Sequence, residues 1–256
     1  MFPISDENPT LRTPIMTIAI LVVTWAVWLL VQGGGDAYAV AISACNLGLV
    51  PGEITGMARL GEGVPLGIID GQGLSCVVDD QALNWATPVL SMFLHGSWGH
   101  IIGNSLYLWV FGNNVEDSMG RARFLAFYLI AGVVAAMAHV AVAPSSPVPT
   151  VGASGAISGI MGAYLVLYPR VKVRTYFPPI FLFRVPAWMV LIFWFAGQLL
   201  AGLPQLRPLE RDVSGGVAVW AHVGGFVAGA LLIRWFRNVD FLRRRKVGAD
   251  AKVVWS

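Results

Sequence analysis

The feature that most constrains this chain is a series of six long apolar runs, each nearly free of charged residues. Each run approaches or exceeds the roughly 18–20 apolar residues that a helix needs to cross a bilayer. Lipid offers the backbone no hydrogen-bond partners, so only helices and closed barrels span it, and no strand-like alternation favours a barrel. We therefore predict an all-α polytopic membrane protein. Its six spans are expected at about 14–32, 94–115, 122–143, 153–169, 185–204 and 217–236.

The composition supports one compact membrane domain. Hydrophobic residues make up 56% of the 256 positions and charged residues 12%, about half the usual soluble share of roughly 25%. The first apolar run lacks a clear small-x-small cleavage site, so we expect a retained anchor. Three segments are predicted: a cytoplasmic N-terminal segment at 1–13, the membrane domain at 14–236 with a long outer loop at about 33–93, and a basic cytoplasmic tail at 237–256.

The basic residues predict which side each loop occupies. With six spans both termini lie on one side, and cytoplasmic termini place 14 of the 17 basic residues on the inner side. Only Arg59, Arg207 and Arg211 then fall outside. This positive-inside asymmetry predicts a multi-pass protein of the cell (inner) membrane with both termini cytoplasmic. The formal charge of +3 gives no reason to expect nucleic-acid binding.

The long outer loop contains the two cysteines of the chain, Cys45 and Cys76. If that side is a periplasm or the cell exterior, an intramolecular disulfide between them is chemically permitted. The sequence alone leaves open whether the two residues lie close enough to bond. The lipid bilayer is the one partner that the composition itself predicts.

The polar residues that enter the spans gather in the outer half. With cytoplasmic termini, the second, fourth and sixth spans all begin on the outer side, which places His100, Asn104, Ser154 and His222 at similar shallow depth. His222 follows the start of its span by about five residues, hence roughly 8 Å at 1.5 Å per residue. His100 and Asn104 are four residues apart and therefore project from one helix face.

Small residues predict which helices pack together. Gly155 and Gly159 form a G-x-x-x-G pattern in the fourth span, and Gly225 and Gly229 repeat it in the sixth, on the face that carries His222. Small residues at this spacing let helix backbones approach closely. If these faces pack together, Ser154 and His222 come within hydrogen-bonding reach.

These residue types suit nucleophilic catalysis. A serine hydroxyl needs a base to take its proton, and histidine is the usual base near neutral pH. The oxyanion formed at a peptide carbonyl needs preorganised donors, here the His100 ring, the Asn104 amide and the Ser154 N–H at a helix N-terminus. No carboxylate within a span is available to orient His222, so the sequence predicts a Ser–His dyad.

Together the motifs resemble the rhomboid family of intramembrane serine proteases. The resemblance covers the six-span core from the first span to the sixth. It rests on His95-Gly96-Ser97-Trp98-Gly99-His100-Ile101-Ile102-Gly103-Asn104 with Phe111-Gly112-Asn113-Asn114-Val115-Glu116, on Gly152-Ala153-Ser154-Gly155-Ala156, and on Trp220-Ala221-His222-Val223-Gly224-Gly225.

The resemblance implies a six-helix bundle and a role for each matching residue. Ser154 corresponds to the nucleophile and His222 to the base, whereas His100 and Asn104 correspond to the oxyanion-stabilising pair. Supporting positions are His95 in the local polar network, Gly152 and Gly155 around the serine, and Glu116, which resembles a carboxylate that braces the inner side of the core. Ser158 is a departure, because some members carry an aromatic residue there that stacks on the catalytic histidine.

The leading hypothesis is an intramembrane serine endopeptidase that hydrolyses peptide bonds in or near transmembrane segments of other membrane proteins. The alternative is a rhomboid-like protein that binds membrane clients without cutting them, although such proteins typically lack the serine or the histidine. A solute carrier or a haem-binding membrane protein is a third reading, and the lack of carboxylates inside the spans disfavours the carrier. No metal or other cofactor is expected, because no cluster of Cys, His and carboxylates has ligand spacing.

Overall fold

The computed structural model describes residues 2–69, 71–177, 181–204 and 218–244. Arg207 and Arg211 of the predicted outer loop, and Arg245, Lys246 and Lys252 of the predicted tail, lie outside the described residues. The described part is mostly helical. Its bundle contains α1 (Ile15–Leu30), α5 (Trp98–Tyr107), α6 (Asn113–Met119), α7 (Arg121–Val142), α8 (Ser154–Leu167), α9 (Ala187–Gly202) and α10 (Val219–Phe236).

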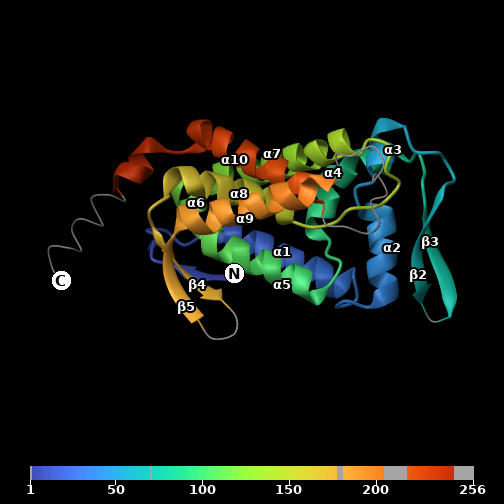
Figure 1. Cartoon of the computed structure of the whole chain (residues 1–256), viewed down its shortest axis with the longest axis horizontal. Coiled ribbons are helices and arrows are strands. Elements are labelled where there is room, and N and C mark those ends of the chain that lie inside the picture. The colour runs from blue at the N-terminus through green and yellow to red at the C-terminus, as the bar shows by residue number, and fades with distance from the viewer. Residues whose placement is uncertain (1, 70, 178–180, 205–217, 245–256) are drawn as a thin grey trace.

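The helices of the bundle run side by side, and the connecting elements gather at its two ends (Figure 1). One end carries the long loop, with α2 (Ala37–Leu47), α3 (Pro51–Thr55), the β2–β3 hairpin and α4 (Thr87–Leu90). At the opposite end lie β4, β5 and the last turns of α10. By length and composition α7 and α10 could each cross a membrane, and α1, α2, α8 and α9 are shorter apolar helices.

Two small sheets show that the all-α expectation was incomplete. β1 (Phe2–Asp6) pairs with β4 (Lys172–Phe177), which pairs with β5 (Phe181–Pro186), and all pairings are antiparallel. β2 (Gly63–Ile69) and β3 (Gln72–Val77) form a separate hairpin. β1 precedes α1, and the other four strands lie in the segments that connect helices, where pairing satisfies backbone hydrogen-bonding groups.

The second and fifth helices depart from their predicted bounds. The second begins at Trp98 instead of 94, because Ser97 caps it by accepting a hydrogen bond from the His100 N–H. It continues through a π-helical segment at Leu108–Gly112 to Met119. The fifth begins at Ala187 instead of 185, because β5 extends through Pro186.

Glu116 and Asp117 therefore lie inside the second helix, not just beyond its inner end as the apolar run suggested. Both are buried. Glu116 accepts hydrogen bonds from Met16 N at 3.0 Å, from Thr17 N at 2.8 Å and from Thr17 Oγ1 at 2.8 Å. It thus satisfies free N–H groups in the first turn of α1, where a negative charge is also favoured by the helix dipole.

Helix α8 lies at the centre of the bundle. It packs most extensively against α10 and α7, and every residue from Gly155 to Tyr164 is buried. In the long loop, Cys45 of α2 and Cys76 of β3 lie at disulfide distance, with Cα atoms 5.2 Å apart. Ser154, the first residue of α8, is half-buried where this buried helix begins.

Candidate active site

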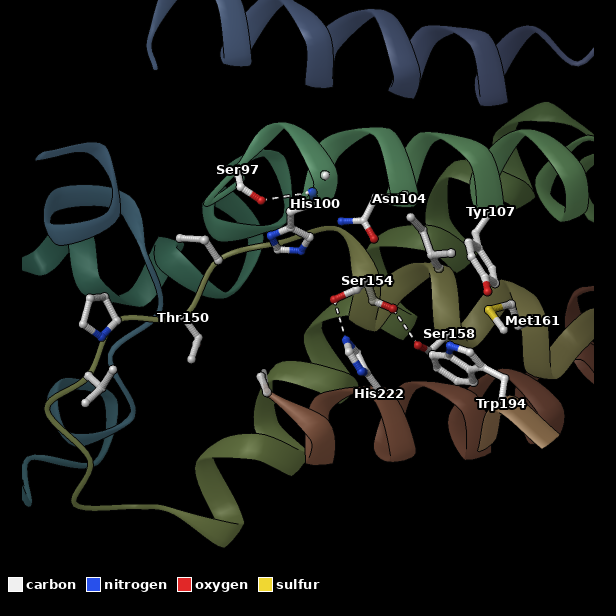
Figure 2. A pocket seen from close by; sticks show the side chains of 17 residues that line it. Ser97, His100, Asn104, Tyr107, Thr150, Ser154, Ser158, Met161, Trp194 and His222 are labelled. Atoms are coloured by element: carbon white, nitrogen blue, oxygen red, sulfur yellow. Dashed lines mark hydrogen bonds between the residues drawn. The ribbon is translucent and has the colours of Figure 1, made fainter. Parts of the chain in front are cut away.

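Ser154 and His222 lie next to each other at the start of α8, where α10 packs against it. Ser154 is the first residue of α8, and its Oγ lies 2.7 Å from His222 Nε2. His222 lies in the first turn of α10 and is buried. The two side chains point toward each other in Figure 2. A serine donating to a histidine nitrogen is the geometry that nucleophile activation requires.

Close glycine packing brings the two helices to this distance. A Cβ built on Gly229 would lie 1.8 Å from the Gly159 carbonyl oxygen, and one built on Gly225 would lie 2.1 Å from the Gly155 oxygen. No side chain larger than hydrogen fits either position, so the backbones of α8 and α10 are in direct contact. The predicted packing of the two glycine faces is confirmed. Gly155 also contacts α7, where its Cβ would lie 2.8 Å from that of Ala135.

A cavity of about 540 Å³ opens beside the serine. His100 and Asn104 of α5 line it opposite His222, and Trp194 of α9 lines it next to Ser158 (Figure 2). The segment before α8, at residues 148–151, forms another part of the lining. The cavity thus leaves open space beside the Ser154 hydroxyl.

Gly152 lets this segment pass against His100. Its φ of +133° is rarely adopted by other residues, and a Cβ there would lie 2.7 Å from His100 Nε2. The glycine therefore sets the spacing between the His100 ring and the start of α8. The structure places Ser154, His222, His100 and Asn104, which span topology put at one depth, around one cavity. Gly152 lies against His100 beside it.

His95 lies behind the cavity and holds Asn104. Its Nε2 is 2.9 Å from Asn104 Nδ2, and its side chain is fully buried. Gln32 anchors the His95 backbone on both sides, accepting from His95 N at 2.9 Å and donating to His95 O at 2.9 Å. This network orients the Asn104 amide and leaves its second N–H hydrogen for another acceptor. Glu116, by contrast, lies at the α1 brace, away from the cavity.

Two residues of the site were missed by sequence reasoning. Gln198 Oε1 lies 2.7 Å from His222 Nδ1, and the Trp194 ring centroid is 5.7 Å from that of His222. Both belong to α9 and are four residues apart, hence on one face. The aromatic neighbour of the histidine therefore comes from α9, whereas Ser158 donates to the Ser154 carbonyl at 2.6 Å. A lone glutamine in an apolar span was the available signal.

The arrangement agrees with the comparisons to known proteins. The Rhomboid domain model matches residues 82–238, which includes every residue of the cavity. The chain belongs to the rhomboid family. This membership implies a polytopic helical membrane fold, and it agrees with the mostly helical structure.

Similar curated proteins come from bacteria and mitochondria. The chain is 41% identical over 81 residues to the rhomboid protease GluP of Bacillus subtilis, covering 32% of this chain and 15% of that protein. It is 31% identical over 170 residues to the mitochondrial Rhomboid protein 1 of Saccharomyces cerevisiae, covering 63% of this chain and 45% of the relative. It is 30% identical over 164 residues to the human mitochondrial presenilin-associated rhomboid-like protein, covering 61% and 39%. The match thus spans less than half the length of these relatives.

Proposed function

We propose that this rhomboid protein is an intramembrane serine endopeptidase, with Ser154 as nucleophile and His222 as general base. The observation that carries the proposal is the 2.7 Å approach of Ser154 Oγ to His222 Nε2 beside an open cavity. His222 takes the hydroxyl proton as Ser154 attacks the peptide carbonyl, and then gives it to the departing amine. Water then hydrolyses the acyl-enzyme: His222 takes a proton from the attacking water and returns it to the departing Ser154 oxygen.

The oxyanion of the tetrahedral intermediate is assigned to the α5 side of the cavity. The Ser154 N–H at the start of α8, the His100 ring and the free Asn104 N–H are the donors. His95 supports them by fixing Asn104. Donors held in place before the reaction need no reorganisation as charge develops, which is why such sites contribute several kcal/mol to catalysis.

The proposed topology has six spans: α1, the continuous helix of α5 and α6, then α7, α8, α9 and α10. Two features support it. β1 pairs with β4, so the N-terminal strand lies at the same end as the last turns of α10 (Figure 1). That end also carries Lys172, Arg174 and Arg184, which favours the cytoplasmic side of a cell membrane.

The length of α8 supports a reaction below the membrane surface. Its 14 residues extend about 21 Å at 1.5 Å per residue, whereas the hydrocarbon core is about 30 Å thick. Ser154 at its first residue therefore lies within the outer part of the bilayer. The substrates we propose are transmembrane segments with small or helix-weakening residues at this depth, because a helix must unwind before its peptide bond reaches Ser154.

Labelling with a fluorophosphonate, which reacts with activated serines, tests this proposal. The full chain in detergent is compared with Ser154→Ala and His222→Ala, and each variant's thermal unfolding is recorded to show that it folds. We expect labelling of the wild type alone. The His222→Ala variant keeps the hydroxyl, so its loss of labelling reports the base and not merely the nucleophile.

The opposite results are equally clear. Labelling that persists in Ser154→Ala would place the reactive group elsewhere in the chain. No labelling of a folded wild type, with the probe active on a control serine protease, would favour a client-binding protein that does not cleave.

A further inference from the structure

Gln198 has the geometry of a third member of the site. Its Oε1 lies 2.7 Å from His222 Nδ1, on the side of the ring opposite Ser154. Both ring nitrogens of His222 are therefore within hydrogen-bonding distance of a side-chain oxygen. A carboxylate often occupies the position behind a catalytic histidine, and here a neutral amide does.

The hydrogen-bond partners determine which nitrogen carries the proton. An amide oxygen is an acceptor only, so Nδ1 must donate to Gln198 Oε1. In the neutral ring Nε2 is then the acceptor, and it faces the Ser154 hydroxyl. This is the tautomer in which His222 can remove a proton from serine.

We propose that Gln198 is a positioning residue that holds His222 in this tautomer and rotamer, and that it stabilises the imidazolium formed during the reaction. The inference rests on the proposed protease function and extends it from a dyad to a Ser–His–Gln relay of hydrogen bonds. Gln198 does not touch substrate. It acts through the imidazole ring alone.

The packing of α9 against α10 fixes this contact. Phe195 stacks on Phe226 of α10 with ring centroids 4.6 Å apart, and Trp194 lies next to the His222 ring. These rings set the register of the two helices, so that Gln198, one turn after Trp194, reaches Nδ1. An amide at this half-buried place supplies an acceptor without the desolvation cost of a buried carboxylate.

The test compares fluorophosphonate labelling rates of the full chain in detergent. Gln198→Met keeps the side-chain length and removes the amide acceptor, whereas Gln198→Glu keeps an acceptor oxygen. Leu200→Met is the matched control, because Leu200 lies on the same helix and is exposed. We expect Gln198→Met to label about 10- to 100-fold more slowly, the loss of one hydrogen bond to a charged group. Gln198→Glu is expected to restore much of the rate, and the control to label as the wild type does.

A spectroscopic readout separates positioning from structural support. In ¹⁵N-histidine NMR spectra of the detergent-solubilised chain, with His222 assigned by its loss in His222→Ala, the wild type should be protonated at Nδ1 and bare at Nε2. Gln198→Met should lose this fixed tautomer while its melting temperature stays close to that of the wild type.

Three results would overturn the inference. Labelling of Gln198→Met at the wild-type rate would overturn the role of Gln198 and leave the protease proposal intact. Equal loss in the Met and Glu variants, both folded, would show that the acceptor oxygen is not what matters. A His222 protonated at Nε2 in the wild type would reverse the assigned roles. No labelling of the wild type would instead remove the protease proposal itself, and this inference with it.

Discussion

Polar residues within the helix bundle serve two different purposes toward the two ends of this molecule. Toward the end that carries β4 and β5, Glu116 and Asp117 are almost fully buried, and their oxygens accept hydrogen bonds from α1 and from the segment before it. Toward the end that carries the long loop, Ser154 and His222 are hydrogen-bonded to each other beside a cavity. The two carboxylates hold helices together, whereas the Ser154–His222 pair leaves a hydroxyl beside open space.

The difference shows that burial and polarity alone do not identify a reactive site. A buried carboxylate that satisfies several donors is a structural brace, because each donor would be costly to leave unpaired. A half-buried serine and a buried histidine with open space beside them leave room for a third molecule. The comparison predicts that substitutions of Glu116 and of its contacts change stability and leave the fluorophosphonate labelling of folded molecules intact.

The largest expected effect comes from the contact that joins α8 to α10. Gly229→Ala places a methyl group 1.8 Å from the Gly159 oxygen, and we expect it to destabilise the protein by about 3 kcal/mol, at the upper end of overpacking. Fluorophosphonate labelling should also fall, since Ser154 and His222 move apart. Thermal unfolding in detergent and the labelling rate measure the two effects.

Gly197→Ala provides the matched control for this substitution. A Cβ on Gly197 of α9 meets nothing within 4 Å, so the change should stabilise the helix by about 0.5–1 kcal/mol. Equal destabilisation by the two alanines would contradict the direct backbone contact between α8 and α10.

The contacts of Glu116 with the start of α1 offer the complementary experiment. Glu116→Ala leaves the N–H groups of Met16 and Thr17 and the Thr17 hydroxyl without their acceptor, which should cost about 2–3 kcal/mol of stability. Labelling per folded molecule should stay at the wild-type rate. Glu116→Gln, which keeps one acceptor oxygen, should lose less. A labelling rate that falls with Glu116→Ala at temperatures where the variant is folded would mean that the two ends are coupled.

That Ser154, His222 and His100 lie close together could be predicted from the sequence, because two simple rules apply there. Span topology placed Ser154, His222 and His100 at one depth, and glycine spacing identified the helix faces that pack. Both rules depend on local pattern and on the thickness of the bilayer. They need no knowledge of side-chain conformation, which is why the predicted cavity residues lie around one cavity in the structure.

The rest depended on tertiary contacts that no local pattern encodes. Gln198 and Trp194 reach His222 only because α9 packs on α10 through Phe195 and Phe226. The strand β1 forms by pairing with β4, which lies about 170 residues later along the chain, so no local pattern predicts it. Hydropathy ended the second span near residue 115, although buried carboxylates continue the helix to Met119 once α1 supplies donors.

A smaller effect is expected from the ion pair beside the brace. Arg12 Nε donates to Asp117 Oδ1 at 3.0 Å, and the guanidinium lies 3.7 Å from the Phe241 ring centroid. Because Arg12 is partly exposed, Arg12→Ala should cost only about 1 kcal/mol. Arg12→Lys keeps the charge and should therefore lose less stability than Arg12→Ala. The recovery should be incomplete, because lysine lacks the planar guanidinium fork. Urea-dependent unfolding of the three proteins measures the series, and a larger loss in Arg12→Lys than in Arg12→Ala would contradict it.

The smallest effect concerns Glu53 in the long loop, and it depends on pH. Burial raises the pKa of Glu53 above its ordinary value of 4.5, the hydrogen bond from Asp79 N lowers it, and the charge of Asp79 raises it further. Because the folded state disfavours the ionised carboxyl, stability from this group is present at low pH and is lost as the pH rises through the folded-state pKa. Glu53→Gln imitates the neutral acid, and its amide oxygen still accepts from Asp79 N. It should therefore unfold at a higher temperature than the wild type near neutral pH, and the difference should vanish as the pH falls below 4.5. A difference that grows on acidification would show that the ionised form of Glu53 is the one the fold prefers.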